Sequence, residues 1–376
     1  MLTAIAVDHY RSLRRLRLPL GQITVVTGAN GTGKSNVYRT LRLLSECARD
    51  GVVAPLAREG GLASSIWAGR QQGKSRPVEL RLGFGCDDFS YAIDLGLPVP
   101  DETSMFNRDP QIKIEAIWAG PVLRPATSLV ERRGPTVRVK DRDSRGWALI
   151  HDRLRSYDSV LNEIADYERA PEVIHVREYM RGWRFYDHFR TDPSAPARLD
   201  AVGTRTPVLD SDGSSLAAAW RTIVEVGDAA GLHETLTSAF PGSRIDINDV
   251  GGRFELAMHQ RGLNRALTAA ELSDGTLRFL LLAAALLSPR PASLLVLNEP
   301  ETSLHPALLP ALGQLIARAA KSTQLFVVSH SQPLIQYVEQ ASSHNLRLIE
   351  LTRDDEGTKI VGLEPLEEPA WHFPER

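Results

Sequence analysis

The glycine-rich segment GANGTGKS, residues 28–35, constrains the fold of this sequence more than any other feature. It follows the β-branched stretch 23–27 and precedes apolar residues at helical spacing between Val37 and Ala48. A strand, a glycine loop and a helix in this order predict a loop that binds nucleotide phosphates. The alternative is a glycine turn that only caps a helix, and the further motifs described below disfavour it.

The residue types of this segment match the chemistry of phosphate binding. Glycines allow successive backbone N–H groups to turn toward a phosphate, and the N-terminus of the following helix adds a partial positive charge. We expect the Lys34 side chain to reach the β- and γ-phosphates and the Ser35 hydroxyl to ligate Mg²⁺. The residues expected to contact the nucleotide here are Asn30, Gly31, Gly33, Lys34, Ser35 and Asn36.

Composition and charge exclude several classes of protein. With 43% hydrophobic and 24% charged residues, the 376-residue chain can bury the core of one large or two ordinary domains. A net charge of -2 gives no general attraction to nucleic acid, so such a partner would need a local basic patch. The two cysteines, Cys47 and Cys86, form no CxxC pair, which disfavours a disulfide framework or a structural zinc site.

The sequence also gives no sign of a membrane segment. Its most apolar run, Phe279 to Leu287, is much shorter than the ~20 residues that cross a bilayer. The N-terminus reaches Asp8 without the apolar core of a signal peptide. We therefore expect a cytoplasmic protein that does not contact the membrane.

The chain is expected to begin and end in mixed strands and helices, with inserts between them. Early strands are predicted at 2–7, 13–18 and 23–27. Alternating residues then predict an inserted antiparallel sheet between residues 78 and 140, with strands at 78–84, 89–95 and 111–118. Helical periodicity follows at 153–167 and 216–226.

The remaining sequence alternates more regularly. A strand pair at 244–248 and 254–259 precedes an apolar helix at 276–287. The elements predicted after it are strand 293–297, helix 307–320, strand 324–328, helix 334–340 and a closing β pair at 346–351 and 359–363. This alternation is typical of an α/β fold.

Three further sites carry residues suited to nucleotide chemistry. The apolar strand that ends at Asn298 is followed by Glu299, a candidate general base, although a solvated acid at a strand end is the ordinary alternative. A second apolar strand delivers His330 to its C-terminal end, where open α/β sheets bind ligands. Ser273 and Gly275 precede the apolar helix, and taken alone they indicate only a helix cap and a turn.

Together these motifs resemble the ABC-type ATPases of the RecF, SMC and OLD group, and especially compact bacterial ATPases that lack a coiled coil. The phosphate loop, the LS-x-G signature (272–276), the Walker B strand (294–299), the D-loop (303–306) and His330 occur in the order of that group. The stretches NEPETSLHP and VVSHS are the most specific.

The resemblance implies an ABC-type head with a mostly parallel core sheet, an antiparallel β subdomain and a helical lobe that carries the signature. We expect a nucleotide-binding lobe at 1–145, a signature lobe at 146–290 and a completing α/β part at 291–376.

The resemblance also implies an ATPase that produces ADP and phosphate and forms a homodimer with ATP. ATP would lie between the phosphate loop of one copy and Ser273 and Gly275 of the other, with Ser303 near the seam. Glu299 and His330 would be catalytic.

Departures from the family pattern affect the metal site and the class of ATPase. Asn298 stands where an aspartate usually supports Mg²⁺, so the expected metal residues are Ser35 and Asn298 and turnover is expected to be attenuated. Asp274 and Thr276 replace residues of the transporter signature, which argues against a transport subunit. A Q-loop residue is not assigned, with Gln71, Gln72 and Gln111 as candidates.

The resemblance favours a role in DNA repair or maintenance. The stretch 124–145, which includes Arg132 and Arg133, and the stretch 177–190, which includes Arg181 and Arg184, are candidate DNA surfaces. In the second stretch, Trp183, Phe185, Tyr186 and Phe189 suit base stacking. The ordinary alternatives are a solvated hairpin face and a helix whose aromatic residues are core. The alternative function is a weakly hydrolysing nucleotide switch that regulates a protein partner, such as an anti-phage defence effector.

Overall fold

The computed structural model describes residues 1–69, 79–141, 146–342, 345–364 and 366–376. The chain forms two compact units. The first unit contains residues 1–21, 26–183 and 348–376, and the second contains residues 22–25 and 184–347. These units differ in their bounds from the lobes expected from the sequence. The expected lobe boundaries at 145 and 290 stay predictions.

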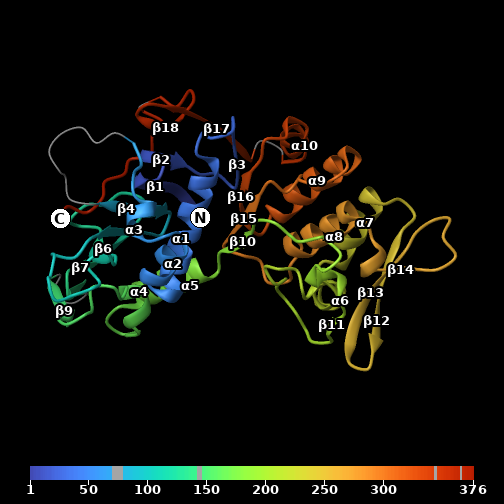
Figure 1. The fold of residues 1–376 in the computed structure, drawn as a ribbon, viewed down its shortest axis with the longest axis horizontal. Coiled ribbons are helices and arrows are strands. Elements are labelled where there is room, and N and C mark those ends of the chain that lie inside the picture. The colour runs from blue at the N-terminus through green and yellow to red at the C-terminus, as the bar shows by residue number, and fades with distance from the viewer. Residues whose placement is uncertain (70–78, 142–145, 343–344, 365) are drawn as a thin grey trace. The chain divides into compact units, whose positions relative to one another are not determined.

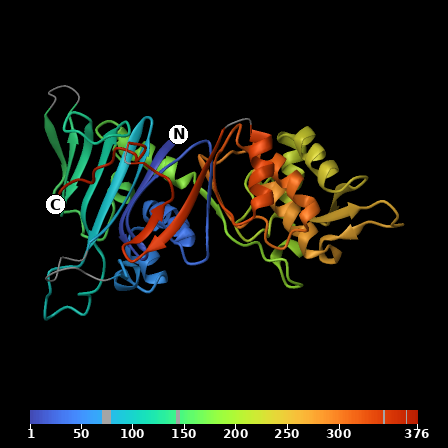
Figure 2. The same cartoon turned by 90° about the horizontal axis from the view of Figure 1, so that it is seen from above.

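The first unit is built on an antiparallel sheet of eight strands in the order β2-β1-β4-β5-β6-β7-β8-β9 (Figures 1 and 2). The strands are β1 (Leu2–Tyr10), β2 (Leu13–Pro19), β4 (Leu80–Cys86), β5 (Phe89–Gly96), β6 (Gln111–Ala119), β7 (Ser128–Arg133), β8 (Thr136–Lys140) and β9 (Trp147–His151). The expected antiparallel sheet is therefore present. It is continuous with the first two strands, because β1 pairs with β4.

Helix α1 (Lys34–Asp50) is the longest helix of the first unit, and its predicted apolar face from Val37 to Ala48 is buried. The other helices are α2 (Val53–Arg58), α3 (Leu62–Ser65), α4 (Val160–Glu163) and α5 (Pro171–Arg181). The long helix predicted over 153–167 was wrong, because only α4 is helical there. The buried Arg132 guanidinium donates to the backbone oxygens of Arg155 and Asp158, so these carbonyls are engaged outside a helix.

A second sheet has six strands in the order β10-β15-β16-β3-β17-β18. They are β3 (Ile23–Gly28), β10 (Arg184–Tyr186), β15 (Leu294–Asn298), β16 (Gln324–Val328), β17 (Leu346–Asp354) and β18 (Gly357–Ile360). β15 pairs in parallel with both β10 and β16, as the buried apolar runs predict. β17 and β18 form the predicted closing antiparallel pair.

The second unit also contains helices and a small antiparallel sheet (Figures 1 and 2). The helices are α6 (Leu216–Val226), α7 (Ala229–Ala239), α8 (Asp274–Leu286), α9 (Leu309–Ala319) and α10 (Gln332–Ser342). The small sheet holds β11 (Ala201–Val202), β12 (Arg244–Val250), β13 (Arg253–His259) and β14 (Leu267–Thr268), and short 3₁₀ turns are η1 (Pro196–Arg198), η2 (Ala269–Glu271) and η3 (Pro306–Leu308). Across the described ranges, no helix combines the length and apolarity that a membrane span requires.

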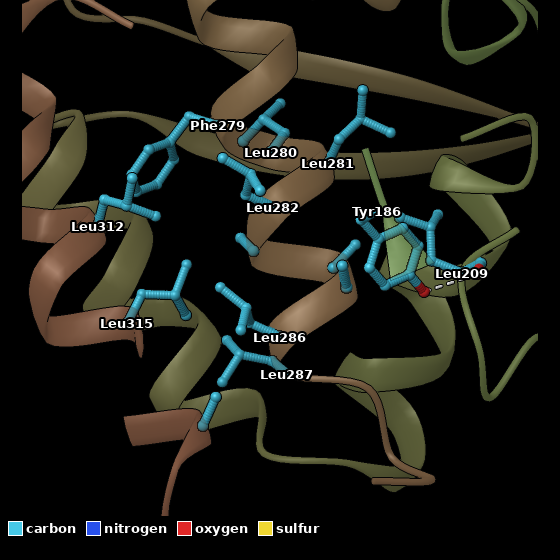
Figure 3. Close-up of a cluster of buried hydrophobic side chains, with 14 of the residues drawn as sticks. Tyr186, Leu209, Phe279, Leu280, Leu281, Leu282, Leu286, Leu287, Leu312 and Leu315 are labelled. Carbon is cyan, nitrogen blue, oxygen red and sulfur yellow. Dashed lines mark hydrogen bonds between the residues drawn. The ribbon is translucent and has the colours of Figure 1, made fainter. Parts of the chain in front are cut away.

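Helix α8 is the centre of the core of the second unit (Figure 3). Its residues from Leu277 to Leu286 are all buried, and all of them except Arg278 are apolar. Figure 3 shows Leu312 and Leu315 of α9 on one side of it and Tyr186 of β10 on the other. This packing fixes the N-terminal end of α8, where the predicted signature residues lie.

Candidate nucleotide-binding site

The phosphate loop lies between β3 and α1, as the sequence predicts. β3 ends at Gly28 and α1 begins at Lys34, with Gly33 as the residue that precedes the helix. Gly33 has a φ of 105°, a left-handed conformation that glycine adopts without strain. The side chain of Ser35 is exposed on the first turn of the helix. The N–H groups of this turn carry the positive end of the helix dipole, which favours an anion.

The Lys34 side chain is held within the loop. Its Nζ donates to the backbone oxygens of Gly28 at 2.6 Å and Ala29 at 3.0 Å, and only 7% of the residue is exposed. The hydroxyl of Thr32 also donates to Ala29, at 2.9 Å. The loop is thus tightened around the lysine ammonium, while Asn30 and Gly31 lie exposed at its tip.

The candidate catalytic residues Glu299 and His330 come together in the second unit. They follow the neighbouring parallel strands β15 and β16, and Glu299 N–H donates to the backbone oxygen of Val328 at 2.8 Å. His330 Nδ1 lies 3.7 Å from Glu299 Oε1, and both side chains are partly exposed. Glu299 has a φ of 46°, which is unfavourable for a residue with a side chain. Such strain is found most often at functional sites.

A second carboxylate in this region, Glu301, received no role from the sequence. Its Oε1 accepts from the Ser329 hydroxyl at 2.7 Å and from His330 N–H at 3.2 Å, and the side chain is 8% exposed. Glu301 therefore fixes the backbone that presents His330. The motif NEPETSLHP contained this residue, but its burial depends on β16, which the local pattern does not reveal.

Arg278 is another residue that the sequence did not single out. It lies on α8, is 2% exposed, and its Nη2 donates to the backbone oxygen of Glu299 at 3.1 Å. Burial lowers the pKa of its guanidinium, and the charges of Glu301 and Glu299 oppose that shift. The buried guanidinium of Arg278 thus links helix α8 to the backbone of the strained Glu299.

The signature and D-loop residues line one pocket of about 360 Å³ in the second unit. Ser273 precedes α8, and its Oγ accepts from Thr276 N–H at 3.2 Å. Gly275 approaches the D-loop so closely that a Cβ atom there would lie 3.0 Å from the Ser303 backbone oxygen. Ser303 itself has a φ of 65°. The structure therefore brings Ser273, Gly275 and Ser303 together, although they are far apart in the sequence.

The two expected metal residues supply oxygen donors of the kind that Mg²⁺ prefers, the Ser35 hydroxyl and the Asn298 amide oxygen. Over the parts of the chain that the structure describes, no group of three His, Cys, Asp or Glu residues could hold a metal ion. Each of these two residue types can therefore ligate a magnesium ion.

Asp187 is an acidic residue at the end of β10, the strand that pairs in parallel with β15. It follows Tyr186, which pairs with Leu297 of β15, so Asp187 and Asn298 each come one residue after the same pair of the two strands. Burial raises the pKa of the Asp187 carboxyl to about 6. Asp187 could not be singled out from the sequence, because β10 has only three residues and its pairing with β15 is not a local feature.

Arg132 is not a DNA contact, which corrects one expectation. Its side chain is fully buried and its Nη1 lies 2.9 Å from the equally buried carboxylate of Glu115. Arg133, its neighbour on the other face of β7, is exposed and donates to the backbone oxygen of Glu375. Arg142 and Arg145 lie outside the described residues.

The second basic stretch is not a stacking surface. Trp183, Tyr186 and Phe189 are buried, and the Trp183 ring packs against Phe84 at 5.3 Å. The core alternative for these aromatic residues was therefore right. Arg184 is half-buried and donates to the Ser288 hydroxyl at 3.1 Å, whereas Arg181 is exposed and lies 3.4 Å from Glu178.

Of the Q-loop candidates, Gln71 and Gln72 lie outside the described residues. Gln111 begins β6 of the eight-stranded sheet, where its position gives no nucleotide role. The Q-loop residue stays unassigned.

The strand β3, the glycine loop and helix α1 have the order and sequence of the phosphate-binding unit of P-loop nucleoside triphosphatases. The sequence profile of the family described as "AAA domain, putative AbiEii toxin, Type IV TA system" matches residues 23–335. The chain belongs to this family of P-loop ATPases. Among curated proteins, no sequence matches the chain.

Solved structures with a similar fold include SMC heads. An SMC head bound to the C-winged helix domain of ScpA is 14% identical, with 97% of this chain and 99% of that chain covered and a TM-score of 0.51. An SMC head domain from Thermotoga maritima is also 14% identical, with 96% and 99% covered and a TM-score of 0.49. The first of these supports the predicted ABC-type head fold, and the resemblance to the RecF, SMC and OLD group is confirmed.

Proposed function

We propose that the protein hydrolyses ATP with Mg²⁺ and forms a dimer when ATP is bound. The observation that carries this proposal is the pairing of Glu299 and His330 at the ends of β15 and β16, with Glu299 held in a strained conformation. A partly exposed carboxylate beside an imidazole is suited to orient a water molecule and accept its proton.

Each residue then has a distinct role toward the nucleotide. Lys34 and the first turn of α1 bind the phosphates, and Ser35 and Asn298 support the metal. The magnesium ion, when bound with ATP, neutralises charge that develops on the phosphate oxygens. Glu299 accepts the proton of the attacking water, and His330 holds that water or the γ-phosphate.

The pocket that contains Ser273, Gly275 and Ser303 supports the dimer. It opens at the N-terminus of α8, a helix of 13 residues whose first N–H groups favour an anion. We infer that this pocket receives the γ-phosphate of ATP bound to a second copy. ADP lacks that phosphate, so the dimer should form with ATP and separate after hydrolysis.

Two substitutions test this proposal by light scattering and by nucleotide titration. Glu299→Gln should keep ATP binding and accumulate a stable dimer with Mg²⁺ and ATP, because the base is lost and the γ-phosphate remains. Lys34→Ala should lower ATP affinity by roughly 10- to 100-fold and give no dimer. A Glu299→Gln protein that stays monomeric at saturating ATP would contradict the dimer, and unchanged affinity in Lys34→Ala would contradict the site.

Asn298 favours a second candidate function, a nucleotide switch that hydrolyses ATP slowly and regulates a protein partner. The missing carboxylate lowers the negative charge available to the metal. In that case the unsubstituted protein should also persist as a dimer with ATP. The lifetime of that dimer distinguishes the two functions.

For the partner on which the ATPase acts, we propose DNA, bound on the exposed face of β8 and β9. Arg138 and Lys140 project from this face of β8, and both lie over the exposed Trp147 ring, at 5.8 Å and 5.4 Å from its centroid. Two cations beside an aromatic ring suit phosphate contact and base stacking. β9 is the last strand in the sheet order.

A salt-dependent DNA titration, with and without ATP, tests this surface. Arg138→Glu/Lys140→Glu should weaken binding and reduce its salt dependence, whereas Arg244→Glu, an exposed arginine of the second unit, should not. If the unsubstituted protein binds no DNA at low salt in any nucleotide state, the DNA role fails and the protein partner becomes the better hypothesis.

A further inference from the structure

Two hydroxyl side chains from opposite ends of the chain meet beside the phosphate loop. Ser12 lies in the turn between β1 and β2, and Thr358 lies on β18, which packs beside β2 (Figure 1). Their Oγ atoms are 3.0 Å apart, and the exposed fractions are 6% and 2%. Thr358 N–H also donates to the Ser12 backbone oxygen at 3.0 Å. The pair is therefore fixed by backbone as well as side-chain contacts.

The two hydroxyls belong to a chain of hydrogen bonds, called the relay below, whose two ends lie on the phosphate loop and the first turn of α1. Thr358 Oγ1 donates to the Thr32 backbone oxygen at 2.8 Å, and Asn36 Nδ2 donates to Ser12 Oγ at 2.8 Å. Because each hydroxyl has one proton, Ser12 must donate to Thr358. The relay thus runs from Asn36 through Ser12 and Thr358 to Thr32.

Gly33 provides the space that the hydroxyl pair occupies. A Cβ atom on Gly33 would lie 2.3 Å from Thr358 Oγ1 and 2.8 Å from Ser12 Oγ. Lys34 and Ser35, the predicted phosphate and metal residues, follow directly, between the two anchored positions Thr32 and Asn36. The relay therefore spans the part of the loop that would contact the nucleotide.

We propose that Ser12 and Thr358 are positioning residues that hold the phosphate loop in its nucleotide-binding conformation. This inference rests on the proposed function, because it assumes that the loop binds ATP. A loop that binds phosphate through backbone N–H groups loses apparent affinity in proportion to the time it spends in other conformations. Since the relay supports the loop rather than Glu299, it acts on nucleotide affinity and leaves the chemical step unchanged.

The chain offers substitutions that separate the hydroxyl from the packing. Thr358→Val keeps the shape of the side chain and removes the hydroxyl, whereas Thr358→Ser keeps the hydroxyl. Thr352→Val is a matched control, because Thr352 lies on β17 of the same hairpin and is exposed. Ser12→Ala removes the other member of the relay.

The experiment is a fluorescence titration of these full-length variants with mant-ATP and mant-ADP in the presence of Mg²⁺, together with steady-state ATP turnover. Thr358→Val should bind both nucleotides roughly tenfold more weakly and raise KM with kcat unchanged. Thr358→Ser and Thr352→Val should bind within twofold of the unsubstituted protein. Ser12→Ala/Thr358→Val should bind no more weakly than the weaker single variant, because both residues act in one relay.

Three results would overturn the inference. They are normal binding by Thr358→Val, equal loss in Thr358→Ser, and additive losses in the double variant. If Thr358→Val does not fold, Ser12→Ala and Thr358→Ser still decide, because the first should weaken binding and the second should not. If the unsubstituted protein binds neither nucleotide, the proposed function itself is refuted. If the unsubstituted protein and the variants all bind normally, only the present inference is refuted.

Discussion

The guanidinium of Arg278 donates to the backbone oxygen of Glu299 at 3.1 Å. This contact joins the helix that begins beside Ser273 and Gly275 to the residue that we propose as the catalytic base. The peptide of Glu299 is held from both sides, because its N–H donates to Val328 and its carbonyl accepts from Arg278. A strained φ of 46° can persist only where such contacts fix it.

The first prediction concerns Arg278. Arg278→Met should lower kcat by roughly 100-fold with ATP affinity within twofold, because a displacement of ~1 Å at the base is enough for such a loss. Steady-state turnover and nucleotide titration measure the two effects, and thermal unfolding shows whether the variant is folded. A folded Arg278→Met protein with normal kcat would be incompatible with this positioning role.

The second prediction concerns the charge at the end of β15. Asn298→Asp should raise ATP turnover and lower the Mg²⁺ concentration needed for half-maximal activity, because it restores a carboxylate to the metal site. The measurement is a Mg²⁺ titration of turnover, with Asn298→Ala as the control that should lower it. Equal turnover in Asn298→Asp and the unsubstituted protein would mean that the amide already suffices.

The third prediction concerns the buried pair of Arg132 and Glu115. Arg132→Met should reduce the free energy of unfolding by about 3 to 5 kcal/mol, because Glu115 would be left buried without its cation. Arg133→Met, on the exposed face of the same strand, should change it by less than about 0.5 kcal/mol. Denaturant unfolding followed by circular dichroism measures both. Equal stability of the two variants would show that Arg132 is not a structural residue.

Regular elements were predicted most accurately where the apolar pattern alone determines burial. α6 and β16 have the bounds expected from the sequence, since α6 has a buried apolar face and β16 is a short run in which every residue is buried. The region 153–167 was mispredicted, because a residue outside it, Arg132, engages its carbonyl groups. Local periodicity contains no information on such a contact.

The residues of the candidate site also fall into two groups, those that the sequence alone could indicate and those that only the structure reveals. Lys34, Glu299 and His330 could be proposed from the sequence because their motifs are local, and their roles stay predictions. Glu301, Arg278 and Asp187 were missed, because their importance depends on which strand or helix lies beside them. The fully buried Arg132 shows the converse error, in which a charged residue within a basic stretch was taken to be exposed.

The fourth prediction concerns the pH dependence of stability at Asp187. Burial raises the pKa of its carboxyl to about 6, from an ordinary value of 3.8. Below pH 3.8 both states are protonated, and as pH rises toward 6 only the unfolded state ionises, so folding becomes less favourable. The loss is complete above pH 6.

Asp187→Asn should therefore raise the melting temperature at pH 7 and change it little at pH 4. Differential scanning calorimetry without nucleotide or Mg²⁺ at both pH values measures this difference. Asp192→Asn is a useful control, because ion pairing lowers the pKa of Asp192 and its substitution should not stabilise the protein at pH 7. A shift of equal size at both pH values for Asp187→Asn would contradict the assignment.

The contact between Ser12 and Thr358 also bears on how the protein is made. The two residues are 346 positions apart, so the ribosome completes the phosphate loop long before it adds the residue that anchors it. Contacts of such long sequence separation form late in folding, because closing the intervening chain costs entropy. A nascent chain that still lacks Thr358 would thus bind nucleotide more weakly than a chain in which the contact has formed. Nucleotide affinity would rise once Thr358 has been added and its contact with Ser12 has formed.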